Sequence, residues 1–524
     1  MKINLSNKVF IIIVIILGFF QLTQQRENPI QHVIHLGMEN HSFDVMFGFL
    51  EGIGELNEKK YCNTYDGQEY CTRKGADYQT TPDPPHSYTA TGQEEFGTTK
   101  VPKDNSQTPD NSGFAETYKK LTGGNPQNVF DCYSEEQVPI MSTLAKNFKV
   151  CDRWFSSLPS CTIPNKLFYH AATSNGVLVN PRPSLSTLLN YPIVADTIEE
   201  NMAKDGLTAE VHWMDWNEAW GISPMNLKQE FSVYDKNFTK FYSQLENGNL
   251  CNYTHLIPSI FWSNLGEGLT EEEDWEKGPN SQHPSEDIRN GELLIKRVYE
   301  ALRKSEYWEK SVLIISYDES GGFYDHVPSP GNVSNPNPDK WKNSFGFEFT
   351  RLGGRIPALV ISPWIGHEVD HTQYEHASLP HTLKEIFNLS SDYLTVRDKE
   401  ANPLFTVDQL LEQPRQDCPL TLPEIPSMEK DKIRFIKEYK LQGSQKDMCL
   451  LIGQMLLSKG YFDAEFLDTI IEKQLENLEQ VKQFLSEGQV ILGLREAEEG
   501  FLFQFLEGYQ EFRKEEEEMK VIFE

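Results

Sequence analysis

The chain has 524 residues, of which 38% are hydrophobic and 12% aromatic, and its formal net charge at pH 7 is −30. This length and apolar content fit one large α/β domain with an accessory domain and argue against a disordered chain. The acidic surface argues against nucleic acid and dense anionic surfaces as partners, because like charges repel. It does not exclude a single lipid molecule that a local site captures during transient contact with a membrane surface.

The N-terminus predicts a signal peptide over residues 1–25. Lys2 and Lys8 precede an almost wholly apolar run from Val9 to Phe20. This run is short for a membrane-spanning helix and typical of the apolar part of a signal peptide. We therefore expect a protein that is secreted or held in an endomembrane or lysosomal lumen, with an uncleaved signal anchor as the alternative.

The cysteine pattern indicates disulfides rather than a zinc ribbon. Eight cysteines occur, and none belongs to a CxxC pair. An even number behind a signal peptide fits an oxidising compartment. Cys62 with Cys71 is the pairing that we expect first, and buried free thiols are the alternative for several of the others. Four sequons are compatible with glycosylation, at Asn237, Asn252, Asn332 and Asn388.

Between residues 28 and 420, short apolar strands alternate with amphipathic helices. The pattern predicts strands at 32–37, 311–317 and 356–361 and helices at 287–303 and 379–387. From Glu51 to Gln127 the chain is polar and rich in Gly and Pro, which predicts loops rather than regular elements. Continuous apolar strands predict a mainly parallel sheet sandwiched by helices, an α/β fold in which ligands bind at the carboxyl ends of the strands.

The composition changes at about Ser427. Residues 427–524 are rich in Glu, Lys, Gln and Leu and poor in Pro, which predicts a C-terminal helical acidic domain. Its charge runs are most simply solvated helix faces. A regulatory or membrane-docking role for this domain is the alternative.

Two polar pairs follow directly after predicted strands. Glu39-Asn40 follows the first strand, and Asp318-Glu319 follows the strand that ends at Tyr317. Carboxylate and amide oxygens are hard ligands for a divalent cation, and adjacent carboxylates that share a cleft repel each other unless a cation offsets the repulsion. Each pair alone is ordinary turn chemistry. Together, at strand ends of one sheet, they favour a metal site.

Thr162 lies at or just before the start of a short helix. Pro164 suits the first helical turn, and the helix is predicted over Asn165–Thr173. Amide N–H groups and the helix dipole at such an end would stabilise an alkoxide or a phosphate, so an activated Thr162 could act as a nucleophile. The spacing alone favours a capping threonine, which is far more common than a nucleophile.

Four histidines lie in polar segments of the chain: His86, His283, His326 and His376. A histidine can hydrogen-bond a phosphate oxygen or protonate a leaving group. Any one of them, taken alone, is more often a structural residue.

A set of longer motifs occurs in a fixed order from about His32 to Asp398. The motifs are MENHSFD, PDPPHSY, CDRWFSSLPSCTIPNKLFYHAATSNG, HPSEDIRNGELLIKRVYEALR, YDESGGFYDHVPSP, RIPALVISPWI and YEHASLPHTLKEIFNL. This set resembles the phosphoesterase family, which contains plant and bacterial non-specific phospholipases C and bacterial acid phosphatases within the alkaline-phosphatase-like superfamily. Several long motifs in the same order make the resemblance specific.

The resemblance implies an alkaline-phosphatase-like fold and a metal-assisted phosphoester hydrolase. It implies four ligands for one divalent ion of unidentified type, namely Glu39, Asn40, Asp318 and Glu319. Thr162 would be the nucleophile, with His86 and His283 around the phosphate. Asp287, His326 and His376 would contact the phosphate or support these groups.

Three functions remain open at this point. The resemblance implies a phospholipase C that releases diacylglycerol and a phosphorylated head group through a phospho-threonine intermediate. The alternatives are an acid phosphatase on soluble phosphomonoesters and a non-catalytic phospholipid-binding protein. The sequence departs from the family pattern at His41, where Arg is usual, and at Ser320 and Glu286, where His is usual. The last two changes leave the acid that protonates the leaving group unidentified.

Overall fold

The computed structural model describes residues 27–427, except 98–100, 103–104, 106, 181–194, 215–230, 261–278, 285 and 338–344. The predicted signal peptide lies outside these residues, as does the predicted C-terminal domain beyond residue 427. The boundaries expected at residues 28 and 420 therefore stay predictions. In the part of the chain that is described, no helix is both long and apolar enough to cross a bilayer.

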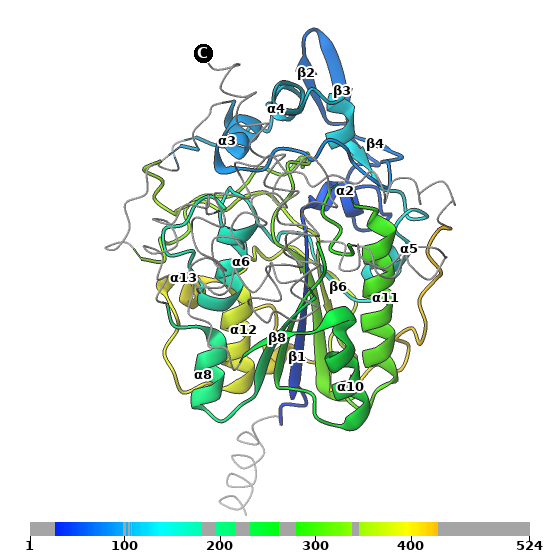
Figure 1. The fold of residues 1–524 in the computed structure, drawn as a ribbon, viewed down its shortest axis with the longest axis vertical. Helices are drawn as coiled ribbons and strands as arrows, with labels where there is room; N and C mark the ends of the chain where they lie inside the picture. The colour runs from blue at the N-terminus through cyan, green and yellow to red at the C-terminus, as the bar shows by residue number, and fades with distance from the viewer. Residues whose placement is uncertain are drawn as a thin grey trace, which may run out of the picture.

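An eight-stranded sheet forms the centre of the molecule (Figure 1). Its strand order is β12-β6-β11-β10-β1-β9-β7-β8. The strands are β1 (His32–Met38), β6 (Lys149–Cys151), β7 (Ala209–Trp213), β8 (Ser232–Tyr234), β9 (Tyr253–Ile257), β10 (Ser311–Tyr317), β11 (Ala358–Ile361) and β12 (Val369–Asp370). All neighbours pair in parallel except β11, which is antiparallel to both β10 and β6. The predicted mainly parallel sheet is confirmed.

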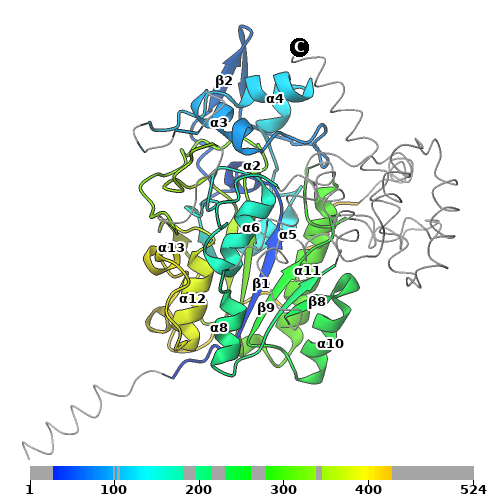
Figure 2. The same ribbon diagram turned by 60° about the vertical axis from the view of Figure 1, so that its left-hand side comes forward.

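Helices cover both faces of the sheet, which explains why its central strands read as continuous apolar runs. The helices are α2 (Phe43–Phe47), α3 (Tyr88–Phe96), α4 (Phe114–Thr122), α5 (Pro139–Ala145), α6 (Thr162–Ala171), α8 (Ile198–Lys204), α10 (Thr239–Asn247), α11 (Ile288–Lys304), α12 (Ser378–Phe387) and α13 (Val396–Glu400). Helices α6, α8 and α12 contact one another on one face, and α5, α10 and α11 lie on the other (Figures 1 and 2). The predicted helices at 287–303 and 379–387 are confirmed as α11 and α12.

The segment from Glu51 to Gln127 contains regular elements, so the prediction of loops alone was wrong. A hairpin of β2 (Cys62–Tyr65) and β3 (Gln68–Cys71) turns at Asp66-Gly67, where both residues have positive φ. The disulfide predicted between Cys62 and Cys71 closes this hairpin. Strand β4 (Arg73–Lys74) and helices α3 and α4 follow, and the whole segment lies beyond the carboxyl ends of the parallel strands (Figure 1).

Candidate active site

The two polar pairs meet because β1 and β10 are neighbours in the sheet. Met38 pairs with Tyr317 at the ends of these strands, so Glu39-Asn40 and Asp318-Glu319 leave the sheet side by side. The backbone N–H of Asn40 donates to Asp318 Oδ1 at 3.0 Å. Gly321 fits tightly here, because a Cβ on it would lie 2.1 Å from the Asn40 carbonyl oxygen. The glycine after Asp318-Glu319 therefore allows the two loops to approach each other.

Four buried oxygens at this edge lack hydrogen-bond partners within the described residues: Asn40 Oδ1, Thr162 Oγ1, Asp318 Oδ2 and Glu319 Oε1. Buried polar atoms are nearly always bonded, so four unpartnered oxygens in one place need an explanation. A divalent cation prefers oxygen ligands of this kind. The residues therefore fit the metal that the sequence predicts, although the metal itself remains a proposal.

Burial raises the pKa values of the two adjacent carboxyls, and repulsion from Asp318 raises that of Glu319 further. Burial raises the pKa of Asp318, while Lys166, the Asn40 amide and the Thr162 hydroxyl act in the opposite direction. The pKa of Glu319 is raised well above its usual value by burial and then by the charge of Asp318, with smaller contributions from Asp83 and Glu94. Burial disfavours the ionised form of both carboxyls, and a bound cation would offset the repulsion between them.

Lys166 is a site residue that the sequence analysis missed. Its Nζ lies 2.5 Å from Glu39 Oε1, and both side chains are buried. The lysine stands one helical turn after Thr162, so a signal was present in the TIPNK motif. Its ammonium group pairs with Glu39 and lowers the pKa of Asp318.

Thr162 is the first residue of α6, and only 1% of it is exposed. Its hydroxyl lies against the Asp318 carboxyl and lowers the pKa of that group. Within the described residues this approach does not reach the geometry of a full hydrogen bond, so Thr162 Oγ1 has no partner. The Ile163 amide donates to Asn180 Oδ1 at 3.0 Å, and Pro164 has no amide hydrogen. The helix start therefore offers an anion fewer amides than the sequence analysis expected.

His86 and His283 lie next to each other beside Asn40. Their ring centroids are 6.0 Å apart. His86 donates from Nδ1 to the Pro84 carbonyl at 2.7 Å, and its Nε2 accepts from Asn40 Nδ2 at 3.4 Å. His283 Nδ1 donates a hydrogen bond to the Pro284 carbonyl oxygen at 2.8 Å. Burial lowers the pKa of His86, so its ring is neutral near pH 7 in this environment.

His376 supports Asp318 through the backbone. Its Nε2 donates to the Asp318 carbonyl at 2.6 Å, and its Nδ1 accepts from the Trp154 indole at 3.2 Å. Burial lowers the pKa of His376 to about 3. The ring is therefore neutral and holds the strand end that carries Asp318.

Asp287 and His326 make structural contacts. Asp287 accepts the Arg289 amide at the start of α11 and pairs with the Arg289 guanidinium at 2.7 Å. His326 Nδ1 bonds Asp44 at 2.8 Å, and its Nε2 bonds Glu55 at 3.0 Å. These contacts bring neither residue to the four unpartnered oxygens, and a phosphate contact for them stays a prediction.

A second feature that the sequence analysis missed is a buried ion-pair network behind the site. Arg355 bonds Asp44 at 2.9 Å and Asp325 at 3.1 Å, and His326 also bonds Asp44. Asp44 lies in α2, shortly after β1, and Asp325 lies in the segment after β10, so Arg355 links the two chain segments that carry the polar pairs. Asp44, Asp325 and His326 could by spacing hold a metal ion, but Arg355 already supplies positive charge there.

The departures from the family pattern supply no positive charge at their positions. His41 stacks on Phe323 with ring centroids 4.7 Å apart, and burial lowers its pKa to about 3, so it carries no charge in place of an arginine. Glu286 accepts from the Ser281 hydroxyl at 3.0 Å and is buried. Ser320 is partly exposed.

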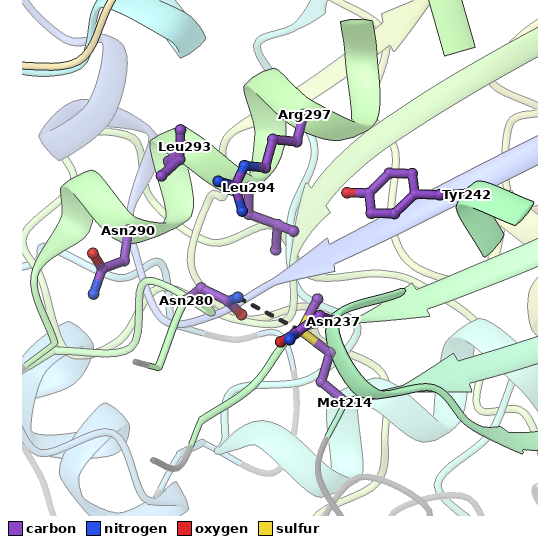
Figure 3. A pocket seen from close by; sticks show the side chains of 8 residues that line it. All are labelled: Met214, Asn237, Tyr242, Asn280, Asn290, Leu293, Leu294 and Arg297. Atoms are coloured by element: carbon purple, nitrogen blue, oxygen red, sulfur yellow. Dashed lines mark hydrogen bonds between the residues drawn. The ribbon is translucent and has the colours of Figure 1, made fainter. Parts of the chain in front are cut away.

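A small cavity of about 40 Å³ lies beside α11, next to Met214, which follows the end of β7 (Figure 3). Asn280, Asn290, Tyr242 and Arg297 line it with polar groups, and Asn280 Nδ2 donates to Met214 Sδ at 3.5 Å. Its lining, as far as the chain is described, includes none of the predicted site residues. The cavity has room for only a few water molecules.

Comparisons with known proteins identify the family. The sequence model described as the Phosphoesterase family matches residues 30–390. Non-specific phospholipase C3 of Arabidopsis thaliana is 35% identical over 424 residues, which cover 76% of this chain and 77% of the relative. Non-specific phospholipase C1 of the same plant is 31% identical over 490 residues, which cover 89% and 87%.

Among solved structures, a protein in the alkaline phosphatase superfamily from Vibrio parahaemolyticus is 16% identical. The match covers 51% of this chain and 65% of that protein, with a TM-score of 0.32. The family match and the similar relatives confirm the resemblance to the phosphoesterase family that the motifs indicate. The chain belongs to the phosphoesterase family and is a phosphoric ester hydrolase.

Proposed function

We propose that the protein is a phospholipase C that cleaves glycerophospholipids to diacylglycerol and a phosphorylated head group, with Thr162 as the nucleophile. The names of relatives that align over about three quarters or more of this chain support the reaction. The observation that carries the role of Thr162 is its place at the start of α6, with its hydroxyl against Asp318 and among unpartnered oxygens.

The four predicted ligands, Glu39, Asn40, Asp318 and Glu319, would hold one divalent cation. Such an ion supplies a Lewis acid that stabilises negative charge on oxygen. Lys166 orients Glu39, and His376 orients Asp318 through its carbonyl. This chain therefore provides a ligand set that its own neighbouring residues hold in place.

Thr162 Oγ1 would form a bond to phosphorus as the bond from phosphorus to the diacylglycerol oxygen breaks. The head group would stay on phosphorus, attached to Thr162, until water releases it. We assign His86 and His283 to the phosphoryl oxygens, because they lie next to each other beside Asn40. Covalent catalysis of this kind splits one difficult displacement into two easier ones.

We also infer that the protein is secreted or resides in an endomembrane lumen. The predicted signal peptide and the disulfide between Cys62 and Cys71 support an oxidising compartment.

The test is to incubate the purified protein with phosphatidylcholine vesicles and, separately, with a soluble phosphomonoester, each with and without a chelator. Release of diacylglycerol that the chelator abolishes is the expected result. Cleavage of the monoester alone would make the protein a phosphatase and overturn the lipid assignment. If a folded, metal-loaded protein cleaves neither substrate, both catalytic readings fail and the non-catalytic alternative gains support.

A further inference from the structure

We infer that Asn165 is a positioning residue that fixes the backbone on the N-terminal side of Thr162 and thereby sets the turnover rate. The inference rests on the proposed function, because it takes Thr162 to be the nucleophile. Asn165 stands in the first turn of α6, three residues after Thr162, and its side chain is fully buried.

The carboxamide of Asn165 folds back over the start of its own helix. Its Oδ1 accepts from the Leu158 amide at 3.0 Å. Its Nδ2 donates to three carbonyl oxygens of the preceding loop, those of Leu158 at 3.1 Å, Ser160 at 2.8 Å and Cys161 at 3.1 Å. One side chain therefore satisfies four backbone groups within the four residues that lead into Thr162.

This arrangement needs both halves of an amide. An NH₂ group has two hydrogens, so three acceptors require at least one shared hydrogen. No single hydroxyl or carboxylate could accept from one backbone group and donate to three others. The three carbonyls also point toward Asn165 Nδ2, so their negative ends are compensated next to the residue whose oxygen must become negative in the reaction.

A second asparagine holds the chain on the other side of Thr162. The backbone N–H of Ile163 donates to Asn180 Oδ1 at 3.0 Å. The backbone N–H of Asn180 donates to Cys161 Sγ at 3.1 Å. The Ser160 hydroxyl donates to the Leu178 carbonyl in the same segment. The residues before and after Thr162 are thus both fixed, and the Thr162 hydroxyl is the group left to face Asp318.

Loss of the hydrogen bonds that Asn165 makes to residues 158–161 should lower kcat and leave KM nearly unchanged. A nucleophile held in the attacking position contributes to the rate of the chemical step, and a displacement of about 1 Å can cost about 100-fold in rate. Substrate binding depends on other groups of the site. Asn165→Asp keeps the shape and the acceptor for the Leu158 amide but removes both donors. We expect it to lower kcat by about 100-fold with KM changed less than about threefold.

The experiment compares Asn165→Asp with a matched buried asparagine, Asn63→Asp. Asn63 also bridges two backbone groups, donating to the Asn111 carbonyl at 2.9 Å and accepting from the Ala115 amide at 3.4 Å. The full-length, metal-loaded proteins are assayed for melting temperature, bound metal, kcat and KM, with a soluble aryl phosphate and with phosphatidylcholine vesicles. Asn63→Asp should lower the melting temperature without a comparable loss of kcat.

Asn180→Ala gives a second test if Asn165→Asp fails to fold, since it removes the bond to the Ile163 amide from outside the helix. It should also lower kcat with KM nearly unchanged. The inference is overturned if a folded Asn165→Asp, or Asn180→Ala in its place, keeps kcat within threefold of the wild type or raises only KM. Thr162→Ala, run alongside, separates the two claims, because full activity in that variant would overturn the proposed nucleophile itself.

Discussion

Lys166 Nζ lies 2.5 Å from Glu39 Oε1, in a site where 6% of the lysine and 1% of the glutamate are exposed. The pair joins the helix that begins at Thr162 to the loop that follows β1. It also places the ammonium group of Lys166 near Asp318, whose pKa Lys166 lowers against the effect of burial. This lysine therefore helps to hold several carboxylates together before any metal binds.

Replacement of Lys166 should destabilise the metal-free protein. Lys166→Met leaves Glu39 buried without its cation, and breaking a buried pair in this way costs about 3–5 kcal/mol. Urea unfolding of the chelated protein measures the loss. Lys120→Met is the matched control, because Lys120 pairs with Glu116 on the surface and its removal should change stability little. Equal stability of Lys166→Met and wild type would show that the pair does not hold the site together.

Neutralising Glu319 should stabilise the metal-free protein and weaken its binding of metal. Its pKa is raised by burial and by Asp318, so the ionised side chain destabilises the metal-free fold near neutral pH. Glu319→Gln should therefore raise the melting temperature of the chelated protein. It should also weaken metal binding by at least about 10-fold. Even the loss of a residue that only hydrogen-bonds a metal ligand lowers metal affinity by about 10–100-fold.

Calorimetric titration with a divalent cation and thermal unfolding with chelator check both parts. Glu199→Gln is the control, since Glu199 is buried but bonds His170 at 2.5 Å. It should leave the metal affinity unchanged. A Glu319→Gln variant that binds metal as tightly as the wild type would remove Glu319 from the ligand set.

Glu292 should make stability fall as the pH rises. Burial raises the pKa of this carboxyl to about 8 in the folded protein, against a usual value of 4.5. Between these values the folded state binds a proton that the unfolded state has released, so the free energy of unfolding decreases from about pH 5 to about pH 8. The whole effect is on the order of a few kcal/mol.

In the wild type, Glu292 accepts a hydrogen bond from the Ile140 backbone N–H at 2.7 Å, and Glu292→Gln keeps an oxygen that can accept it. The variant should lose most of this part of the pH dependence, as measured by urea unfolding from pH 5 to pH 8. The same slope in wild type and variant would show that Glu292 does not titrate in this range.

The parts of the fold that depend on local pattern could be predicted from the sequence. The apolar runs of β1 and β10 were clear, and the polar pairs meet because these strands are neighbours. Thr162 was placed at or just before the start of a helix, and α6 does begin there, although the helix itself was predicted from Asn165, three residues later. The hairpin at Asp66-Gly67 also carried a local signal, an Asp-Gly turn between short β-forming segments, which the sequence analysis overlooked.

The parts that depend on distant partners could not be predicted in this way. Lys166 meets Glu39 across 127 positions, and Arg355 meets Asp44 across 311. Which turn of a helix faces which loop is decided by packing of the whole domain rather than by the residues nearby. Short strands such as β6 and β12 lack a pattern long enough to recognise.

The most direct test of the account is to trap the covalent intermediate. Wild-type protein is mixed with phosphatidylcholine, quenched in acid within its first turnover, digested and examined by mass spectrometry. The account predicts a phosphocholine adduct on Thr162, a simple phosphoryl adduct there when a monoester is used, and neither adduct in Thr162→Ala. An adduct on another residue, or wild-type turnover by Thr162→Ala, would contradict the assignment of Thr162 as the nucleophile.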